Sequence, residues 1–138
     1  MKRISLVFIL GILLVLPLLS QQEARFMTYP DIDGNTIVFT YEGDLWKVNL
    51  EGDSGTAIRL TNFPGNEYAA KFSPNGKEIA FTGGYENDHS VYTIPVTGGQ
   101  PLRITYSPGG ATTVEWTPDG KKVVYNSYMQ TAIRRDPK

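Results

Sequence analysis

The sequence contains no cysteine and a single histidine, and these absences exclude several kinds of chemistry. Without cysteine there is no disulfide, no thiolate metal ligand, no cysteine nucleophile and no lipid-modified cysteine. One histidine, His89, is too few for a multi-histidine metal site. An excess of basic residues is also missing, because 13 lysines and arginines stand against 14 acids. This balance argues against a nucleic-acid surface, whose affinity comes mainly from basic side chains.

The amino-terminal segment has the pattern of an export signal. Lys2 and Arg3 precede an almost unbroken apolar run of 16 residues, 4–19, which is shorter than the ~20 residues of a membrane span. We therefore predict a signal peptide at 1–20, cleaved after Ser20 or, alternatively, after Ala24, rather than a retained anchor. The protein is expected to be exported, periplasmic or extracellular. Removing residues 1–20 leaves three more acids than bases.

The rest of the chain contains three copies of one sequence pattern. Glycines in equivalent turns, Gly34, Gly76 and Gly120, are 42 and then 44 residues apart, and each precedes an apolar segment. Two other segments recur with a similar period, 45–48 as 91–94 and 58–61 as 102–105. A fixed period of this length indicates a repeat architecture.

Each repeat is predicted to form strands, because β-branched and aromatic residues lie between turn sequences and no helical apolar period occurs. Proline before a glycine-containing pair, as in Ser73–Gly76, is typical of a tight hairpin. The predicted strands are, in order within the repeat, 68–72 and 112–116, then 78–82 and 122–126, then 91–96, then 102–105. Four strands in about 43 residues is the size of a propeller blade.

The second strand of each repeat is apolar at consecutive positions, at 37–39, 79–81 and 123–125. Such a strand is buried on both faces, which favours stacked blades over a two-layer sandwich. We predict an all-β fold of about two and a half four-stranded β-propeller blades, at about 25–61, 67–105 and 111–138, the last incomplete. Because propellers close with four to eight blades, the chain is expected to be the front of a longer product.

Several segments resemble known families. The unit from Phe72 to Phe81 resembles the WD-like blade repeat of TolB and of peptidase-associated propellers. The order of 29–39, 43–48, 59–65 and 114–121 resembles the amino-terminal propeller of the tricorn protease family. That resemblance covers about 25–128 and implies a large serine peptidase whose propellers admit peptides. The family's PDZ-like and catalytic domains would follow later, so no catalytic residue is carried over. Family members are usually cytoplasmic, and the signal peptide departs from this.

The polar residues that could form a site have structural explanations. His89 lies in a polar loop and is expected to be an exposed imidazole, since no glycine-serine elbow accompanies it. Asp31, Asp33, Asn35 and Glu42 have calcium-loop spacing, but position 6 is Thr36 rather than glycine. We interpret Asp31 and Asp33 as hairpin caps. No catalytic, cofactor-binding or metal-ligating residue is assigned.

The aromatic and acidic residues receive similar interpretations. Trp46 aligns with Tyr92, and Trp116 with Phe72, so both tryptophans are expected to fill space between blades. Two loop tyrosines are expected to be free to contact a ligand, Tyr85 and Tyr106. Four acids are expected to be unpaired and solvated: Glu51, Glu67, Glu86 and Asp88.

The predicted function is the propeller segment of an exported tricorn-like serine peptidase, which scaffolds and gates peptide access to a catalytic domain that this chain lacks. The expected partners are peptide or protein substrates and the rest of the longer chain, with no nucleic acid, no cofactor, and contact with the membrane only through the uncleaved signal peptide. Two alternatives remain open: a non-enzymatic TolB-like periplasmic propeller, and the propeller of a prolyl oligopeptidase-like or amidohydrolase enzyme.

Overall fold

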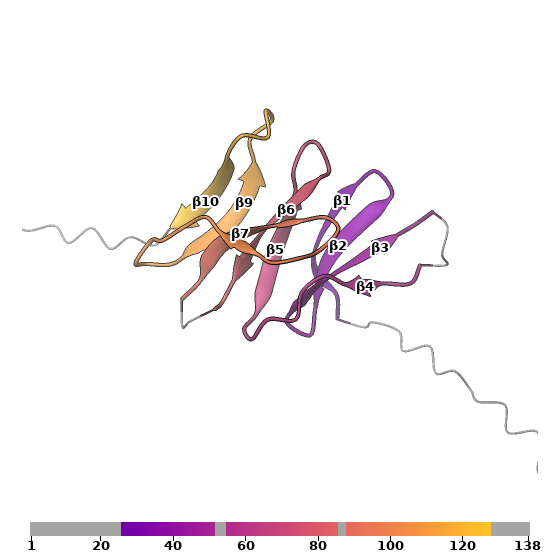
Figure 1. The fold of residues 1–138 in the computed structure, drawn as a ribbon, viewed down its shortest axis with the longest axis horizontal. Helices are drawn as coiled ribbons and strands as arrows, with labels where there is room; N and C mark the ends of the chain where they lie inside the picture. The colour runs from indigo at the N-terminus through magenta and orange to yellow at the C-terminus, as the bar shows by residue number, and fades with distance from the viewer. Residues whose placement is uncertain (1–25, 52–54, 86–87, 128–138) are drawn as a thin grey trace, which may run out of the picture.

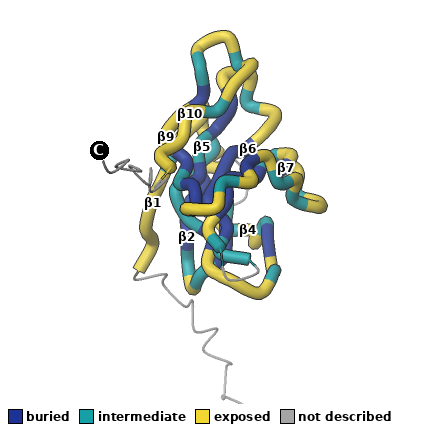
Figure 2. Tube along the Cα trace, turned by 90° about the vertical axis from the view of Figure 1, so that its left-hand side faces the viewer, coloured by how far each residue is buried: buried dark blue, intermediate teal, exposed yellow. Residues whose placement is uncertain are grey.

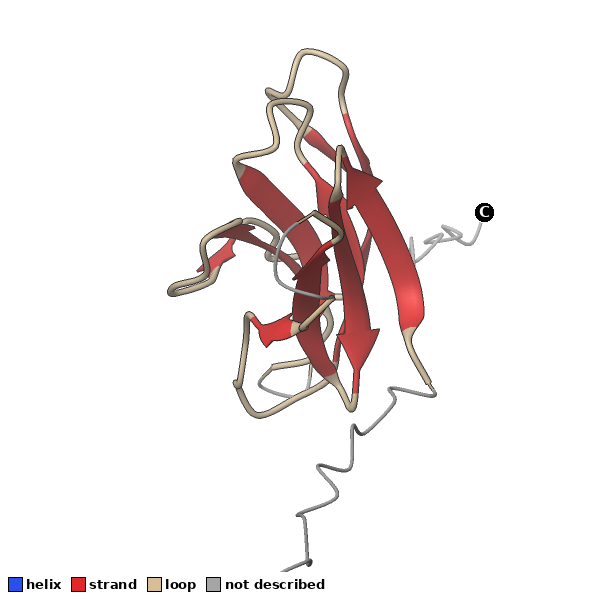
Figure 3. Cartoon of the chain, turned by 90° about the vertical axis from the view of Figure 1, so that its right-hand side faces the viewer, coloured by secondary structure: helices blue, strands red, loops and turns tan. Residues whose placement is uncertain are grey.

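A computed structural model describes residues 26–51, 55–85 and 88–127, and the predicted signal peptide lies outside these ranges. The described ranges contain strands, turns and irregular segments, and no helix in them is long and apolar enough to cross a membrane (Figure 3). The ten strands are β1 (Thr28–Asp33), β2 (Thr36–Tyr41), β3 (Asp44–Asn49), β4 (Ile58–Arg59), β5 (Glu67–Phe72), β6 (Glu78–Gly83), β7 (Ser90–Pro95), β8 (Leu102–Arg103), β9 (Ala111–Trp116) and β10 (Val123–Ser127).

The strands form three antiparallel sheets whose order follows the sequence: β1-β2-β3-β4, β5-β6-β7-β8 and β9-β10 (Figure 1). The three glycines of the repeat adopt positive φ angles, 54° at Gly34, 64° at Gly76 and 67° at Gly120. Such angles are strained for other residues, which explains why glycine recurs at the tip of each first hairpin. The predicted all-β fold with propeller blades is confirmed.

The fourth strand of the second sheet is shorter than predicted. The sequence indicated 102–105, whereas β8 ends at Arg103. The physical reason is a side-chain contact, because the Thr105 hydroxyl accepts the hydrogen bond of the Val91 backbone N–H at 2.8 Å. A hydroxyl thus takes the place that a backbone carbonyl would hold in a continuing ladder.

The sheets stack face to face, with the first strands β1, β5 and β9 adjacent to one another (Figure 1). An apolar cluster lies between the first two sheets and comprises Val38, Leu45, Ala70, Phe72, Ile79, Phe81, Tyr92 and Ile94. Removing such side chains from water is the dominant favourable contribution to folding. The core of the protein is therefore the seam between two blades, not the interior of one blade.

The second strands of the three sheets differ in burial, and β2 in the first sheet has three consecutive buried residues, 38–40 (Figure 2). In β6, which has a sheet on either side, every residue from Ile79 to Gly83 is buried. In β10, which belongs to the end sheet, none of the five residues is buried, and Val124 is 48% exposed. The prediction that consecutive apolar residues mean burial on both faces is confirmed for 79–81 in β6. It is wrong for 123–125 in β10, because among the described residues no further sheet covers the outer face of that strand.

Candidate functional site

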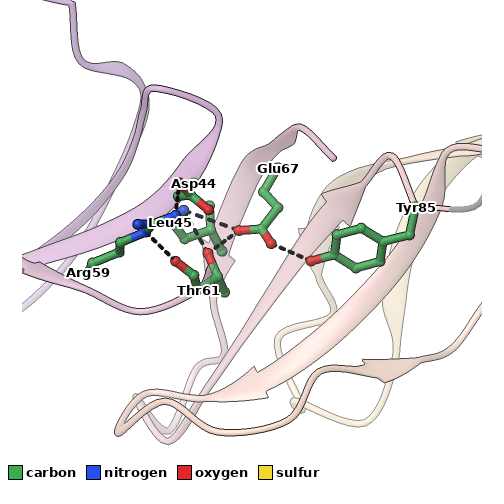
Figure 4. A network of polar contacts seen from close by, with 6 residues as sticks. All are labelled: Asp44, Leu45, Arg59, Thr61, Glu67 and Tyr85. Carbon is green, nitrogen blue, oxygen red and sulfur yellow. Dashed lines mark hydrogen bonds and ion pairs between the residues drawn. The ribbon is translucent and has the colours of Figure 1, made fainter. Parts of the chain in front are cut away.

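A buried carboxylate lies in the seam between the first two sheets, at the start of β5. Glu67 is 0% exposed, and its side chain reaches from the second sheet to the first. Its Oε2 atom accepts hydrogen bonds from the Thr61 hydroxyl and from the Leu45 backbone N–H, the latter at 3.2 Å. Its Oε1 atom accepts from the Tyr85 hydroxyl (Figure 4). The carboxylate thus joins two sheets and the loop after β6.

The backbone places Glu67 at this point. The N–H of Glu67 donates to the Gly43 carbonyl at 2.8 Å, which attaches the first residue of β5 to the β2–β3 hairpin. That hairpin turns through two residues of positive φ, 51° at Glu42 and 86° at Gly43. Glycine accepts this conformation without steric cost. The tight turn therefore brings the start of β3 within reach of the Glu67 side chain.

The surroundings of Glu67 control its protonation. Burial raises the pKa of Glu67 above its ordinary value, hydrogen bonds from Thr61, Tyr85 and Leu45 lower the pKa in part, and the charge of Asp44 adds to the rise. Burial and the bond to Glu67 also raise the pKa of Tyr85, so its hydroxyl stays protonated and donates. Among the described residues, none forms an ion pair with Glu67. The hydrogen bonds that this carboxyl group accepts from the described residues all come from uncharged donors.

An ion pair beside Glu67 orients Thr61. The Arg59 guanidinium donates through Nη2 to Asp44 Oδ2 at 2.6 Å and through Nε to the Thr61 carbonyl at 2.7 Å. Arg59 therefore connects β4 to the start of β3 and fixes the backbone of Thr61. The Thr61 hydroxyl also accepts the Leu45 N–H at 2.9 Å, so it is both acceptor and donor within the network.

Most of this network recurs in the second sheet, beside the seam between the second and third sheets, which we call the second seam. There, the Val91 N–H donates to the Thr105 hydroxyl at 2.8 Å, and Arg103 Nε donates to the Thr105 carbonyl at 2.8 Å. Arg103 also pairs with Asp88 at 3.4 Å. The same contacts therefore occur in both blades, where an arginine and a threonine join the third and fourth strands.

Glu67 is the part of the network that does not recur. β9 begins with Ala111 where β5 begins with Glu67, and the Ala111 N–H still donates to a hairpin carbonyl, that of His89, at 2.7 Å. The backbone contact is thus general, whereas the carboxylate is specific to the first seam.

Charged side chains also connect the first strands of the sheets. Asp31 on β1 accepts the Phe72 N–H at 2.8 Å and the Lys71 ammonium at 3.0 Å. Lys71 reaches Glu115 on β9 at 3.9 Å. The Trp116 indole N–H donates to the Lys71 carbonyl at 3.0 Å. Each first strand is therefore joined to the next by at least one side-chain contact.

Several sequence predictions about these residues were wrong. Glu67 is not solvated but fully buried, and Asp88 is paired with Arg103. Tyr85 is not free, because it is half-buried and bonded to Glu67. Neither Asp31 nor Asp33 caps its own hairpin. The Asp31 carboxylate joins two sheets. The Asp33 carboxylate has no hydrogen-bond partner among the described residues and lies against Gly76 of the next sheet. Alignment of Glu67 with the apolar Ala111 was the signal that could have identified position 67 as internal.

Other predictions agree with the structure. His89 is exposed and contacts only the edge of the Tyr68 ring among the aromatic contacts of the described residues. Glu51 is exposed, and Tyr106 is 75% exposed although the Arg103 guanidinium lies over its ring. Glu86 lies outside the described residues.

The expectation that the tryptophans fill space between blades agrees with the structure for Trp116 and stays a prediction for Trp46, which lies outside the apolar cluster between the sheets. Trp46 pairs with Phe39 across β2 and β3, as Tyr92 pairs with Phe81 across β6 and β7. Trp116 is 9% exposed, and its indole reaches the neighbouring sheet. Packing between blades therefore accounts for Trp116.

Comparison with known proteins decides the family. The sequence model of the tricorn protease N-terminal β-propeller domain matches residues 24–138. The chain belongs to this family. Its resemblance to tricorn propellers, inferred from the segment order, is thereby confirmed.

The relatives of this tricorn-type propeller are much longer than the matched region. A protein of Sulfurisphaera tokodaii named as a tricorn-like protease N-terminal subunit is 40% identical over 57 residues, which are 41% of this chain and 28% of the relative. Tricorn protease homolog 1 of Streptomyces coelicolor is 31% identical over 73 residues, 53% of this chain and 7% of the relative. The chain thus matches well under two thirds of the length of these curated relatives.

Solved structures agree on the architecture. The crystal structure of the tricorn protease superposes with a TM-score of 0.58 and 30% identity, covering 68% of this chain and 10% of that one. A structure assigned to TolB of Agrobacterium tumefaciens superposes with a TM-score of 0.65 and 26% identity, covering 72% of this chain and 37% of that one. Both support stacked propeller blades.

The Glu67→Ala substitution tests the structural role of the carboxylate. It leaves the Tyr85 hydroxyl without its acceptor and opens a cavity in the seam, so the free energy of unfolding should fall by about 2–4 kcal/mol. Urea denaturation measures this loss. Glu78→Ala is the matched control, because Glu78 is exposed, and should change stability by less than about 0.5 kcal/mol. Equal effects of the two substitutions would contradict the assignment.

The pH dependence of stability tests the raised pKa of Glu67. A carboxyl whose pKa is higher in the folded state contributes its stability fully below the unfolded-state pKa, and this contribution is lost as pH rises through the folded-state pKa. The stability of the wild type relative to Glu67→Gln should therefore decrease as pH rises above about 4.5, the ordinary value. Chemical denaturation of both proteins across pH 4 to 8 measures the difference. A difference that grows with pH would show a lowered pKa instead.

Proposed function

We propose that this tricorn-type propeller belongs to an exported serine peptidase and that it scaffolds and gates the access of peptides to a catalytic domain elsewhere in the longer protein. The observation that carries this proposal is the match of the tricorn N-terminal propeller family over residues 24–138. The apolar run that follows Lys2 and Arg3 supports the exported location.

The contacts across the first seam support a gating role. A channel selects peptides by size only if its wall does not yield, and here the Glu67 network and the apolar cluster hold the first two blades together. The first strands β1, β5 and β9 are the part of each sheet nearest its neighbours, and we assign them to the wall of the channel.

A second candidate is a non-enzymatic propeller that binds protein partners through its loops. The observation in its favour is the similarity to the TolB structure, whose TM-score of 0.65 exceeds that of the tricorn protease. The two candidates differ in their chemistry, since only the first requires peptide hydrolysis by the longer protein.

Peptidase assays separate these candidates. The 138-residue chain alone should not hydrolyse fluorogenic peptides, whereas the longer protein that contains it should, and His89→Ala should leave that activity unchanged because the imidazole is an exposed loop side chain. Hydrolysis by the short chain that His89→Ala abolishes would overturn the proposal. A longer protein without hydrolytic activity would favour the binding propeller.

Fractionation of expressing cells tests the export step. The mature protein should begin at Gln21 and occur outside the inner membrane, as measured by mass spectrometry of the amino terminus. A protein that keeps residues 1–20 and remains in the cytoplasm would contradict export without affecting the family assignment.

A further inference from the structure

A groove of about 440 Å³ lies at the end of the first seam that is distant from Glu67. Glu67 begins β5, and Phe72, which lines the groove, ends it. The first sheet contributes residues from the ends of β1 and β3, and the second contributes the β5–β6 hairpin and the residue after β7. A volume of this size is sufficient for one large side chain or a small ligand.

The groove has apolar lining residues, here called its floor, and charged lining residues, here called its rim. Phe72 is 7% exposed, Val96 is half-buried, and Ile58 presents its side chain at 59% exposure. An aliphatic chain lying on this floor would lose contact with water.

The rim has two carboxylates that lack donors. Asp33 and Glu51 line the groove, and neither side chain has a hydrogen-bond or ion-pair partner among the described residues. The Asp33 carboxylate lies against Gly76 of the facing hairpin, where a side chain would collide with it. The absence of a side chain at Gly76 therefore leaves room for this carboxylate at the groove.

The groove already contains one basic side chain, and its contacts show how such a group is held. Lys47 extends from β3 across the groove, and its ammonium donates to the Val96 carbonyl of the second sheet at 2.7 Å. The Lys47 charge is thus directed to a carbonyl on the opposite wall. Asp33 and Glu51 remain as acceptors for a second cation.

We propose that this groove binds the basic side chain of a peptide, arginine in particular, with its methylene groups on the apolar floor and its guanidinium donating to Asp33 and Glu51. A guanidinium offers five N–H donors in a planar fork and can donate to more than one carboxylate. The proposal concerns binding at this groove and does not depend on the proposed gating or on export.

The second seam lacks the equivalent residues. In the repeat, Asn75 takes the position of Asp33. Thr93 takes the position of Lys47, because Thr93 pairs with Ala80 as Lys47 pairs with the equivalent Val38. The charges that define the groove are therefore particular to the first seam, as Glu67 is at the other end of it.

Titration of the 138-residue chain with two short peptides tests the proposal. The probe is Ala-Arg-Ala with both ends blocked, and the reference is the same peptide with citrulline, which keeps the shape of arginine and removes its charge. Binding is followed through the backbone NMR signals of the groove residues Gly76 and Thr56. The arginine peptide should shift these signals saturably and bind at least about fivefold more tightly than the citrulline peptide.

Substitutions locate the binding. Asp33→Asn and Glu51→Gln should each weaken the arginine peptide by about three- to fivefold. Asp119→Asn is the matched control, because Asp119 occupies the equivalent hairpin of the third sheet, and Asn75 makes the same turn contacts in the second. It should leave binding unchanged.

Three results would overturn the proposal. One is the absence of a saturable shift, and another is equal affinity for the citrulline peptide. The third is an equal loss of affinity in Asp119→Asn, which would show general attraction to an acidic protein rather than binding in the groove.

Discussion

The arrangement of this protein depends on the burial of one carboxyl group between two sheets. A blade buries little apolar surface by itself, so it needs a neighbouring blade, and the neighbour must be placed in one register. The apolar cluster is not directional, whereas the bonds from Thr61, Leu45 and Tyr85 to Glu67 are. Glu67 therefore specifies how the first two blades meet.

Residues that recur in each blade and residues that occur in only one blade have different roles in this chain. Arg59 and Thr61 recur as Arg103 and Thr105, and they perform the same task of joining strands within a blade. Glu67 does not recur, so the first seam contains a buried carboxyl group that the second seam lacks. Specific chemistry in a repeat protein is expected at such exceptions, because the regular positions are already used for packing.

The sequence was sufficient for the architecture but not for the site. Glycine spacing and consecutive apolar residues predicted the blades, since turn geometry and burial are local requirements. Glu67 and Tyr85 were misassigned because a charged residue or a loop tyrosine is usually solvated, and the donors of Glu67 come from residues 6 to 22 positions away. Only the alignment of Glu67 with Ala111 carried that information.

Native-state hydrogen exchange of the seam amides tests most directly whether the blades stabilise one another. The account predicts that the backbone amides of Leu45 in the first sheet and Glu67 in the second exchange with the same free energy of opening, because the network that buries them opens as one unit. It also predicts that Glu67→Ala lowers the free energy of opening of both amides by the same amount. Different free energies for the two amides, with a substitution effect confined to the second sheet, would show that each blade is stable alone and would contradict the account.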